Sequence, residues 1–169
     1  MKLEEFSFSR LNAGNRVALL VFYTKMFQSR AAWRLCFPDG FIKNPVQATT
    51  FLVDKTQVLI GAWAETKLLG VARLENFSGQ AAQIHFAFLP HTPRGDAYQI
   101  GVDFLKWISA SEFRLSTLIG LIHSRNTGAI NFVKDIGFEQ IATIEDSGFD
   151  SREKLFDKVM VKWRGVSLT

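Results

Sequence analysis

The apolar positions near the carboxyl-terminal end of the chain predict one short helix with both of its ends specified. Four of them recur at the spacing of one helical face: Ala129, Phe132, Val133 and Ile136. Asn126 precedes this stripe and can accept hydrogen bonds from the free N–H groups of a first helical turn. Gly137 follows it and can adopt the left-handed conformation that ends a helix. An apolar run, Leu115–Ile122, comes before the helix and a β-prone run, Phe138–Ile144, comes after it, so a strand–helix–strand unit is predicted.

Other helical periodicities place two helices early in the chain and one after its middle. An amphipathic helix is predicted over Asn12–Gln28 and a second, shorter one over Arg30–Cys36. The apolar stripe of the first helix consists of Val17, Leu20, Val21, Thr24 and Phe27. The later helix begins near Ala97, and its stripe consists of Ala97, Ile100, Gly101, Phe104, Leu105 and Ile108.

Alternating and β-prone runs predict the remaining strands. These strands are Phe6–Phe8, Thr49–Asp54, Gln57–Glu65, Leu68–Glu75, Ala82–Leu89 and Lys154–Trp163. The three runs between residues 49 and 75 follow one another through short connections, which is typical of an antiparallel meander. Asn76–Gly79 is predicted to be a turn and Glu145–Ser151 a loop. The last run has apolar residues on both faces, so it is expected to lie inside the sheet.

Composition limits the class of protein. The 169 residues suffice for about one domain, and 47% hydrophobic against 21% charged residues excludes a globally disordered chain. The net charge of +4 is spread along the chain without a basic run, which disfavours a nucleic-acid partner. Apolar stretches fall short of the roughly 20 residues of a membrane span, and the amino terminus does not resemble a secretory signal. Cys36 is the only cysteine, so a soluble cytoplasmic protein without disulfides is expected.

The sequence Asn126–Phe138 and its place between two strands resemble the last segment of GNAT-type N-acetyltransferases, which transfer an acetyl group from acetyl-CoA to an amine. The resemblance covers nearly the whole chain if Thr49–Asp54 is an additional segment rather than a strand of the sheet. It implies an α/β (α+β) single-domain GNAT-like fold over residues 1–169, with the order β-α-α-β-β-β-α-β-α-β-β. The implied central sheet is mixed and splayed, has about seven strands and is flanked by helices.

The loop before the later helix carries the candidate phosphate site. Backbone N–H groups at a helix start bind phosphate, and a glycine there lets a ligand approach closely. Arg94-Gly95-Asp96-Ala97 resembles the family loop that holds the CoA pyrophosphate, although Asp96 brings a negative charge and Tyr98 is bulky for its position. The resemblance assigns to acetyl-CoA, as co-substrate, the residues Phe88, Leu89, Arg94, Gly95, Asp96, Ala97, Tyr98, Asn126, Ala129 and Phe132. An ordinary solvated turn, with Asn126 only a helix cap and Phe132 only core, is the alternative.

This sequence has fewer candidate catalytic residues than the resemblance to the GNAT family implies. The family often has a carboxylate on its fourth strand and a Tyr acid after the aromatic that matches Phe132, where this chain has Val133. His85 has a reference pKa near neutrality and could serve as the base, or it could be a hydrogen-bonded core residue. His123 could lie near the thioester, and Tyr98 could replace the missing acid. The three histidines are too few and too far apart in sequence to indicate a metal site.

Two functions from different classes stay open. The first is an N-acetyltransferase that moves an acetyl group from acetyl-CoA to an unidentified primary amine by direct attack. The second is a catalytically degenerate GNAT-like binding or assembly protein. The segment His85-Phe86-Ala87-Phe88 resembles GNAT-type proteins of tailed bacteriophages, so the expected location is the cytoplasm of a bacterium or a phage-infected host. The acceptor, and whether the chain forms a homodimer, are left open.

Overall fold

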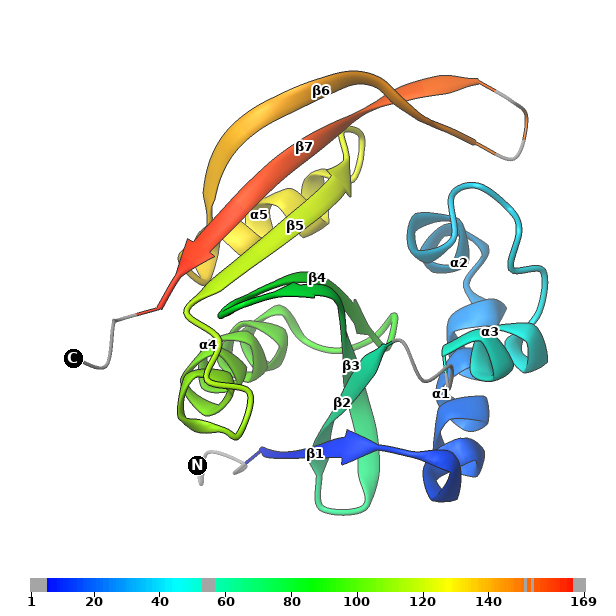
Figure 1. Cartoon of the computed structure of the whole chain (residues 1–169). Coiled ribbons are helices and arrows are strands. Elements are labelled where there is room, and N and C mark those ends of the chain that lie inside the picture. Colours follow the sequence, from blue (N-terminus) through cyan, green and yellow to red (C-terminus); the bar gives the residue numbers. More distant parts are fainter. Residues whose placement is uncertain (1–5, 53–56, 151, 153, 166–169) are drawn as a thin grey trace.

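A seven-stranded mixed sheet runs through the protein in the order β1-β2-β3-β4-β5-β7-β6 (Figure 1). The computed structural model describes residues 6–52, 57–150, 152 and 154–165. The strands are β1 Ser7–Leu11, β2 Val58–Ala64, β3 Lys67–Ser78, β4 Ala81–Phe88, β5 Thr117–His123, β6 Glu139–Phe149 and β7 Leu155–Arg164. The helices are α1 Arg16–Gln28, α2 Arg30–Cys36, α3 Pro45–Leu52, α4 Arg94–Ala110 and α5 Thr127–Asp135, with a 3-10 turn at Ala13–Asn15 before α1. The predicted fold class and element order are confirmed.

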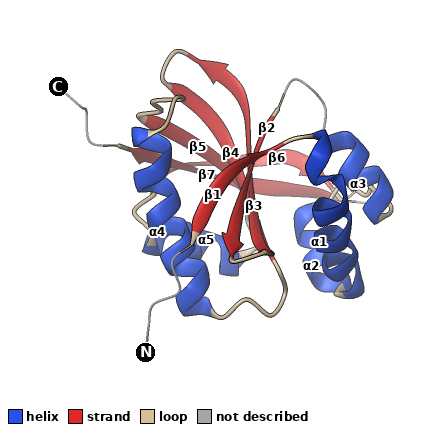
Figure 2. Cartoon of the chain, turned by 90° about the horizontal axis from the view of Figure 1, so that it is seen from below, coloured by secondary structure: helices blue, strands red, loops and turns tan. Residues whose placement is uncertain are grey.

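Helices cover both faces of the sheet (Figure 2). On one face, α4 and α5 close a core that includes Ile84, Phe104, Ile108 and Leu118. On the other face, α1 and α2 pack a second cluster around Phe22 and other buried side chains: Leu19, Tyr23, Met26, Trp33, Leu59 and Val71. Strand alternation separates the two sets, because successive side chains of a strand point to opposite faces.

The sheet is continuous in its two halves but barely joined at its middle. Strands β1 to β4 pair antiparallel, and β5, β7 and β6 form a second antiparallel group. Between the halves, β4 and β5 run parallel and pair over three positions only, from Ala81↔Thr117 to Gln83↔Ile119. Beyond Gln83 the two strands part, which Figure 1 shows as a V that opens toward α1 and α2. The splayed sheet and the interior position of β7 were both predicted.

The buried face of α1 is not the predicted one. Val17, Leu20, Val21, Thr24 and Phe27 are exposed, whereas Leu19, Phe22, Tyr23 and Met26 are buried. Both faces of this helix carry apolar residues, so its periodicity alone does not select the side that packs.

Thr49–Asp54 was predicted to be a strand, but its described part belongs to α3, which extends through Leu52. Residues 53–54 lie outside the described residues. Local capping overrides the β propensity of this segment. The Asn44 Oδ1 accepts a hydrogen bond from the Gln47 N–H at 2.9 Å, and Pro45 starts the helix where a missing N–H costs nothing.

The predicted turn after β3 was placed too early in the chain, and the predicted loop before β7 was too long. Strand β3 continues through the predicted turn to Ser78, and the chain reverses at Gly79. Most of the predicted loop Glu145–Ser151 belongs to β6, which pairs with β7 through Phe149↔Leu155 after an irregularity between Ile144 and Gly148. As an edge strand, β6 is largely exposed and lacks the apolar alternation that marks a buried strand. No helix among the described ranges is long and apolar enough to cross a membrane.

Gly137 ends α5 with a φ of +102°, a conformation that side chains with a Cβ rarely adopt. We expect Gly137→Ala to lower the free energy of unfolding by about 1–2 kcal/mol. Gly128→Ala, in the first turn of the same helix and without a positive φ, is the matched control and should leave stability unchanged or slightly raised. Urea denaturation of the two variants measures the difference; equal stabilities would contradict this account of the helix end.

Candidate active site

The V between β4 and β5 leaves part of the β4 backbone without a strand neighbour. From Ile84 to Phe88, this strand pairs with β3 on one side only. Its N–H and C=O groups on the other side are therefore available to an extended ligand, as at any free sheet edge. His85 lies two residues beyond the last pair, at the start of the opening.

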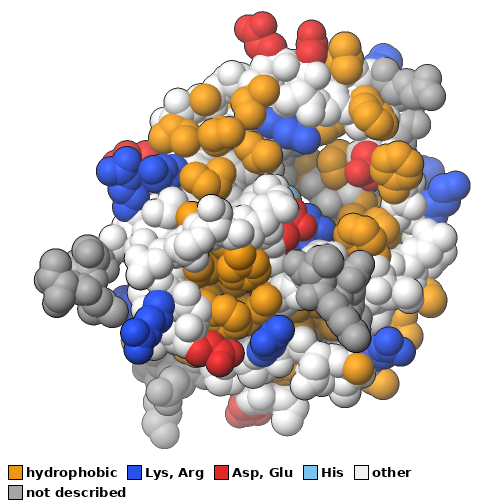
Figure 3. Space-filling view, viewed as in Figure 1, with side chains coloured by type: hydrophobic (Ala, Val, Ile, Leu, Met, Phe, Trp, Pro, Cys, Tyr) orange, Lys and Arg blue, Asp and Glu red, His pale blue; other side chains and the backbone are white. Residues whose placement is uncertain are grey.

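A polar cluster lies on the face of β3 and β4 that α1 and α2 cover. Arg73 and His85 are directly opposite each other in the pairing, and Glu75 is opposite Gln83. The Glu75 Oε1 lies 2.8 Å from the His85 Nε2 and 3.4 Å from an Arg73 Nη2. Figure 3 shows acidic, basic and histidine side chains on the floor of a hollow between the β5–β7 half and the helices. The cluster is about 70–80% buried, with side-chain exposures of 20% for Arg73, 23% for Glu75 and 33% for His85.

The hydrogen bond to Glu75 fixes the tautomer of His85. The His85 hydrogen bond is the main cause that lowers the pKa of Glu75, so Glu75 is a carboxylate at neutral pH and accepts from Nε2–H. The Gln83 Nε2 also lies 3.1 Å from this nitrogen, and two N–H donors cannot meet there, so we assign the amide with its oxygen toward the ring; Asn76, whose Nδ2 lies 3.0 Å from the other end of the Gln83 amide, can complement either orientation. The Nδ1 lone pair is then free to accept a proton.

Burial is the main cause that lowers the pKa of His85 below its ordinary value. The charges of Arg73 and Lys158 lower it further, while the hydrogen bond and charge of Glu75 oppose the shift. His85 is therefore neutral at pH 7, which is the form a general base requires. The lowered pKa means that protonation of His85 destabilises the folded chain as the pH falls below about 6.5.

His123 lies at the end of β5, on the other arm of the V. Its ring stacks on Phe156 with centroids 3.9 Å apart, and its Nδ1 accepts a hydrogen bond from the Arg125 N–H at 3.1 Å. Burial and the charge of Arg125 lower its pKa. Phe156 can take this position because its β6 neighbour is Gly148, where a Cβ would come within 2.5 Å of the ring. Lys158 is the strand partner of His123, and its positive charge contributes to lowering the pKa of His85.

The amino terminus of α4 is open in the way that an anion site requires. No side chain caps it, and a Cβ built on Gly95 meets nothing within 4 Å. A surface pocket of about 350 Å³ adjoins it, lined on one side by the β2–β3 turn with Lys67 and on the other by Thr92, Pro93 and Asp96. The Thr92 hydroxyl is buried without a hydrogen-bond partner among the described residues. Arg94 is exposed and pairs with Asp135 of α5 at 2.8 Å.

Tyr98 and Ala97 follow in the first turn of α4. Tyr98 is 45% exposed and belongs to the helix on the opposite face of the sheet from His85. Asn126 caps α5 by accepting a hydrogen bond from the Ala129 N–H at 3.1 Å. The structure thus brings His85 together with Glu75 and Arg73, places His123 across the V, and leaves Tyr98 away from both.

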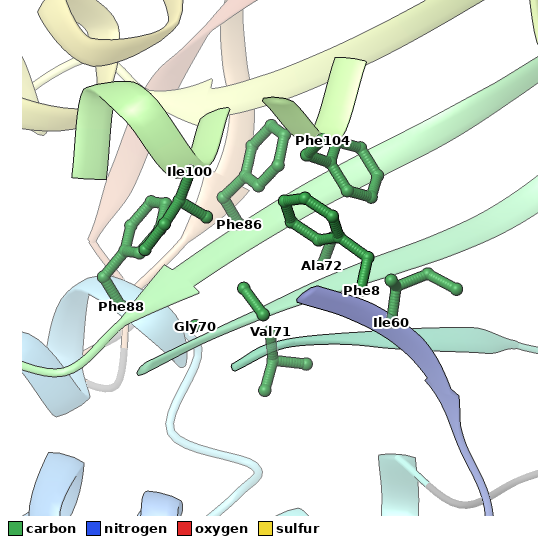
Figure 4. A pocket seen from close by; sticks show the side chains of 10 residues that line it. Phe8, Ile60, Gly70, Val71, Ala72, Phe86, Phe88, Ile100 and Phe104 are labelled. Atoms are coloured by element: carbon green, nitrogen blue, oxygen red, sulfur yellow. The ribbon is translucent and has the colours of Figure 1, made fainter. Parts of the chain in front are cut away.

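Aromatic rings fill the α4 side of β4. Phe132 of α5 contacts Phe88 and Phe86 of β4, with centroids 5.1 Å and 5.6 Å away. It also lies against Gly101 of α4, where a Cβ would come within 2.9 Å of the ring. Figure 4 shows Phe86 and Phe88 directed toward the α4 side chains Ile100 and Phe104, around a residual cavity of about 10 Å³. This face is packed, and the polar chemistry lies on the other one.

Sequence reasoning missed Glu75 and Arg73. It searched β4 for a carboxylate and found none, whereas the carboxylate that serves His85 comes from the neighbouring strand. The signal was present in the alternation of β3, where Arg73 and Glu75 share the face of Val71. Recognising it requires the register of β3 on β4, which the sequence does not give.

Comparison with known proteins finds the fold but no sequence relative. No family model matches the sequence, and no curated protein matches it. The structure is similar to a ribosomal-protein-S5-alanine acetyltransferase from Vibrio fischeri, with a TM-score of 0.77, 9% identity and coverage of 100% of this chain and 98% of that one. It is also similar to a spermidine N-acetyltransferase from Vibrio cholerae in complex with CoA and spermine, with a TM-score of 0.73, 13% identity and 96% coverage of both chains. A probable acetyltransferase from Staphylococcus epidermidis gives 0.71 at 16% identity, over 96% of this chain and 100% of that one. The chain has the GNAT-type N-acetyltransferase fold.

Opposite changes around His85 should shift its pKa in opposite directions. Glu75→Gln removes the negative charge that raises the pKa of His85, so the pKa should fall further. Arg73→Gln removes a positive charge that lowers it, so the pKa should rise. Lys106→Gln, on the exposed side of α4, is the control and should leave it unchanged. Histidine NMR titration measures all three, and a shift of the same sign in the first two would contradict the cluster.

Proposed function

We propose that this protein is an acetyl-CoA-dependent N-acetyltransferase that transfers the acetyl group to an amine by direct attack. The observation that carries the proposal is the His85–Glu75 pair at the point where β4 and β5 part. The fold supports an acyltransferase at the level of architecture, and a neighbour of the same fold was solved with CoA and an amine. Fold alone does not assign activity, so the argument rests on the site.

The β4 edge and the α4 terminus suit the parts of acetyl-CoA. The free N–H and C=O groups of residues 84–88 can pair with the amides of the pantetheine arm. The uncapped N–H groups of Arg94, Gly95 and Asp96 can bind the pyrophosphate, with the unpaired Thr92 hydroxyl beside them. The adjoining pocket carries Lys67 together with two acids, Glu65 and Asp96, so the backbone N–H groups rather than side-chain charge would hold the pyrophosphate there. Asn126 and Ala129, at the start of α5, would border the same ligand.

His85 would act as the general base. Its Nδ1 takes a proton from the amine while Glu75 holds Nε2–H and stabilises the imidazolium that forms. The amine nitrogen forms a bond to the carbonyl carbon of the thioester, and the carbon–sulfur bond breaks. The leaving thiolate takes up, through solvent, the proton that His85 received, which returns His85 to its neutral form and gives the acetylated amine and CoA as products. Because a thiolate leaves readily, positioning of the two reactants supplies much of the rate and a strong acid at Val133 is not needed.

A second candidate function is a GNAT-like binding protein without catalysis. The Phe86, Phe88 and Phe132 rings favour it, because they contact one another beside the opening of the V. An acetyl-CoA arm must pass along these rings or displace one of them. Measurement of acetyl-CoA binding therefore separates the two candidates.

Acetyl-CoA should bind and raise the melting temperature of the protein. Gly95→Glu places a carboxylate beside the proposed pyrophosphate and should weaken binding by about tenfold. Thr50→Glu adds the same charge on α3, on the other face of the sheet, and should leave binding unchanged. Isothermal titration calorimetry gives the dissociation constants. If millimolar acetyl-CoA neither binds nor shifts the melting temperature, the transferase proposal fails and the binding protein is favoured.

His85→Gln should lower kcat by about 10²-fold and leave the dissociation constant for acetyl-CoA unchanged. Because burial lowers the pKa of His85, the rise of rate with pH that it controls should lie at lower pH than that of an ordinary histidine. Tyr98→Phe and His123→Gln test the other two candidates. Steady-state kinetics with thiol detection measures each variant; an unchanged kcat in His85→Gln would remove His85 from the mechanism.

A further inference from the structure

Arg73 is a largely buried cation whose hydrogen-bonding capacity is not used. Its Nε is buried without a partner among the described residues, and its one side-chain contact is the 3.4 Å approach of Nη2 to Glu75. Glu75 is itself bound more closely by His85, at 2.8 Å. One carboxylate therefore serves two groups, and the guanidinium keeps most of its five N–H donors free. Nε has almost no accessible surface, so the Nη donors are the ones that stay available to a ligand in the hollow.

The surroundings of Arg73 add positive charge and no second acid. Of the described residues whose charges act on His85, Arg73 and Lys158 are cations and Glu75 is the one acid. On the helix side, the charge of Arg73 acts on the pKa of Tyr23 of α1 and of Cys36 of α2. Burial raises the pKa of both, that of Cys36 to about 11, so both are neutral at pH 7. The floor of the hollow carries more positive than negative charge.

We propose that the acceptor amine also carries an anionic oxygen group, a carboxylate or a phosphate, which Arg73 binds while the amine meets His85. This inference rests on the proposed function and names the class of its second substrate. A guanidinium binds such oxygens through paired N–H donors, and the two Nη groups of Arg73 can form one such pair. A polyamine is disfavoured here, because it would add cations beside Arg73 and Lys158.

The spacing of the two side chains limits the length of the acceptor. Arg73 and His85 are directly opposite in antiparallel strands, which puts their Cβ atoms about 4.5–5.5 Å apart. Glu75 contacts both side chains and holds them toward the same space. An amine and an anion separated by only a few bonds, as in an α-amino acid or an aminoalkyl phosphate, suit this spacing.

The first test compares matched acceptors on the unaltered protein. A panel of L-amino acids is paired with the corresponding carboxamides, and O-phosphoethanolamine is paired with ethanolamine. We expect kcat/KM to be about 10- to 100-fold higher for the anionic member of a pair, the size of a charged hydrogen-bonded contact. A preference within the amino-acid pairs identifies a carboxylate, and one within the other pair a phosphate. Equal or higher kcat/KM for every neutral member overturns the inference while leaving the transferase proposal intact.

The second test assigns the preference to Arg73. Arg73→Gln should remove the discrimination within a pair, and Arg73→Lys, which keeps the charge but not the paired donors, should restore part of it. Lys106→Gln is the control, and the dissociation constant for acetyl-CoA should be the same in all these variants. A uniform loss of rate for both members of each pair would show that Arg73 is only structural and would overturn the assignment.

A binding measurement without acetyl-CoA separates this inference from the proposed function. An anion held at Arg73 adds negative charge near His85, so inorganic phosphate or acetate, which carries no ammonium group to oppose the effect, should raise the pKa of His85 in an NMR titration. The shift should be absent in Arg73→Gln. If the protein does not bind acetyl-CoA but this shift is seen, the transferase proposal fails and the anion site stands. No shift with any of these anions overturns the anion site, whether or not acetyl-CoA binds.

Discussion

The parting of β4 and β5 is the constraint on which the rest of the structure depends. Three parallel pairs join the halves of the sheet, and beyond them each half keeps its own antiparallel neighbours, while one core under α4 and α5 spans both. A continuous sheet would satisfy the β4 backbone from both sides and would have no room for a hollow. The unpaired edge and the polar cluster beside it are consequences of the same break. The helix terminus at α4 completes the opening because it directly follows β4.

Low solvent exposure gives the cluster its chemical character. Outside the protein, His85 and Glu75 would titrate almost independently, but among buried neighbours each one acts on the other. Glu75 orients His85 and also offsets part of the charge of Arg73. One carboxylate cannot do both fully, so the cluster combines a neutral base with an incompletely paired cation. The same feature thus supports both the chemistry and the choice of substrate proposed above.

The sequence predicted the parts of the fold that depend on local pattern. The spacing of apolar residues predicted the buried stripe of α4, and the capping residues predicted the helix from Asn126 to Gly137. Apolar residues on both faces of β7 predicted its interior position in the sheet. It did not predict which side of α1 packs, because that helix is apolar on both sides. It also mistook α3 for a strand, because capping by Asn44 and Pro45 outweighed β propensity. His85 was found from its residue type alone, but its partners depend on strand register, which long-range packing determines.

Gly148 has an effect well beyond the edge strand in which it lies. Its missing side chain makes room for Phe156, and this ring supports the imidazole of His123 two strands away from β6. Any larger residue there would meet the Phe156 ring at 2.5 Å and force it to move. The support of His123 on one side of the V therefore depends on the outer rim of the sheet, at a position remote in sequence from every residue of the cluster.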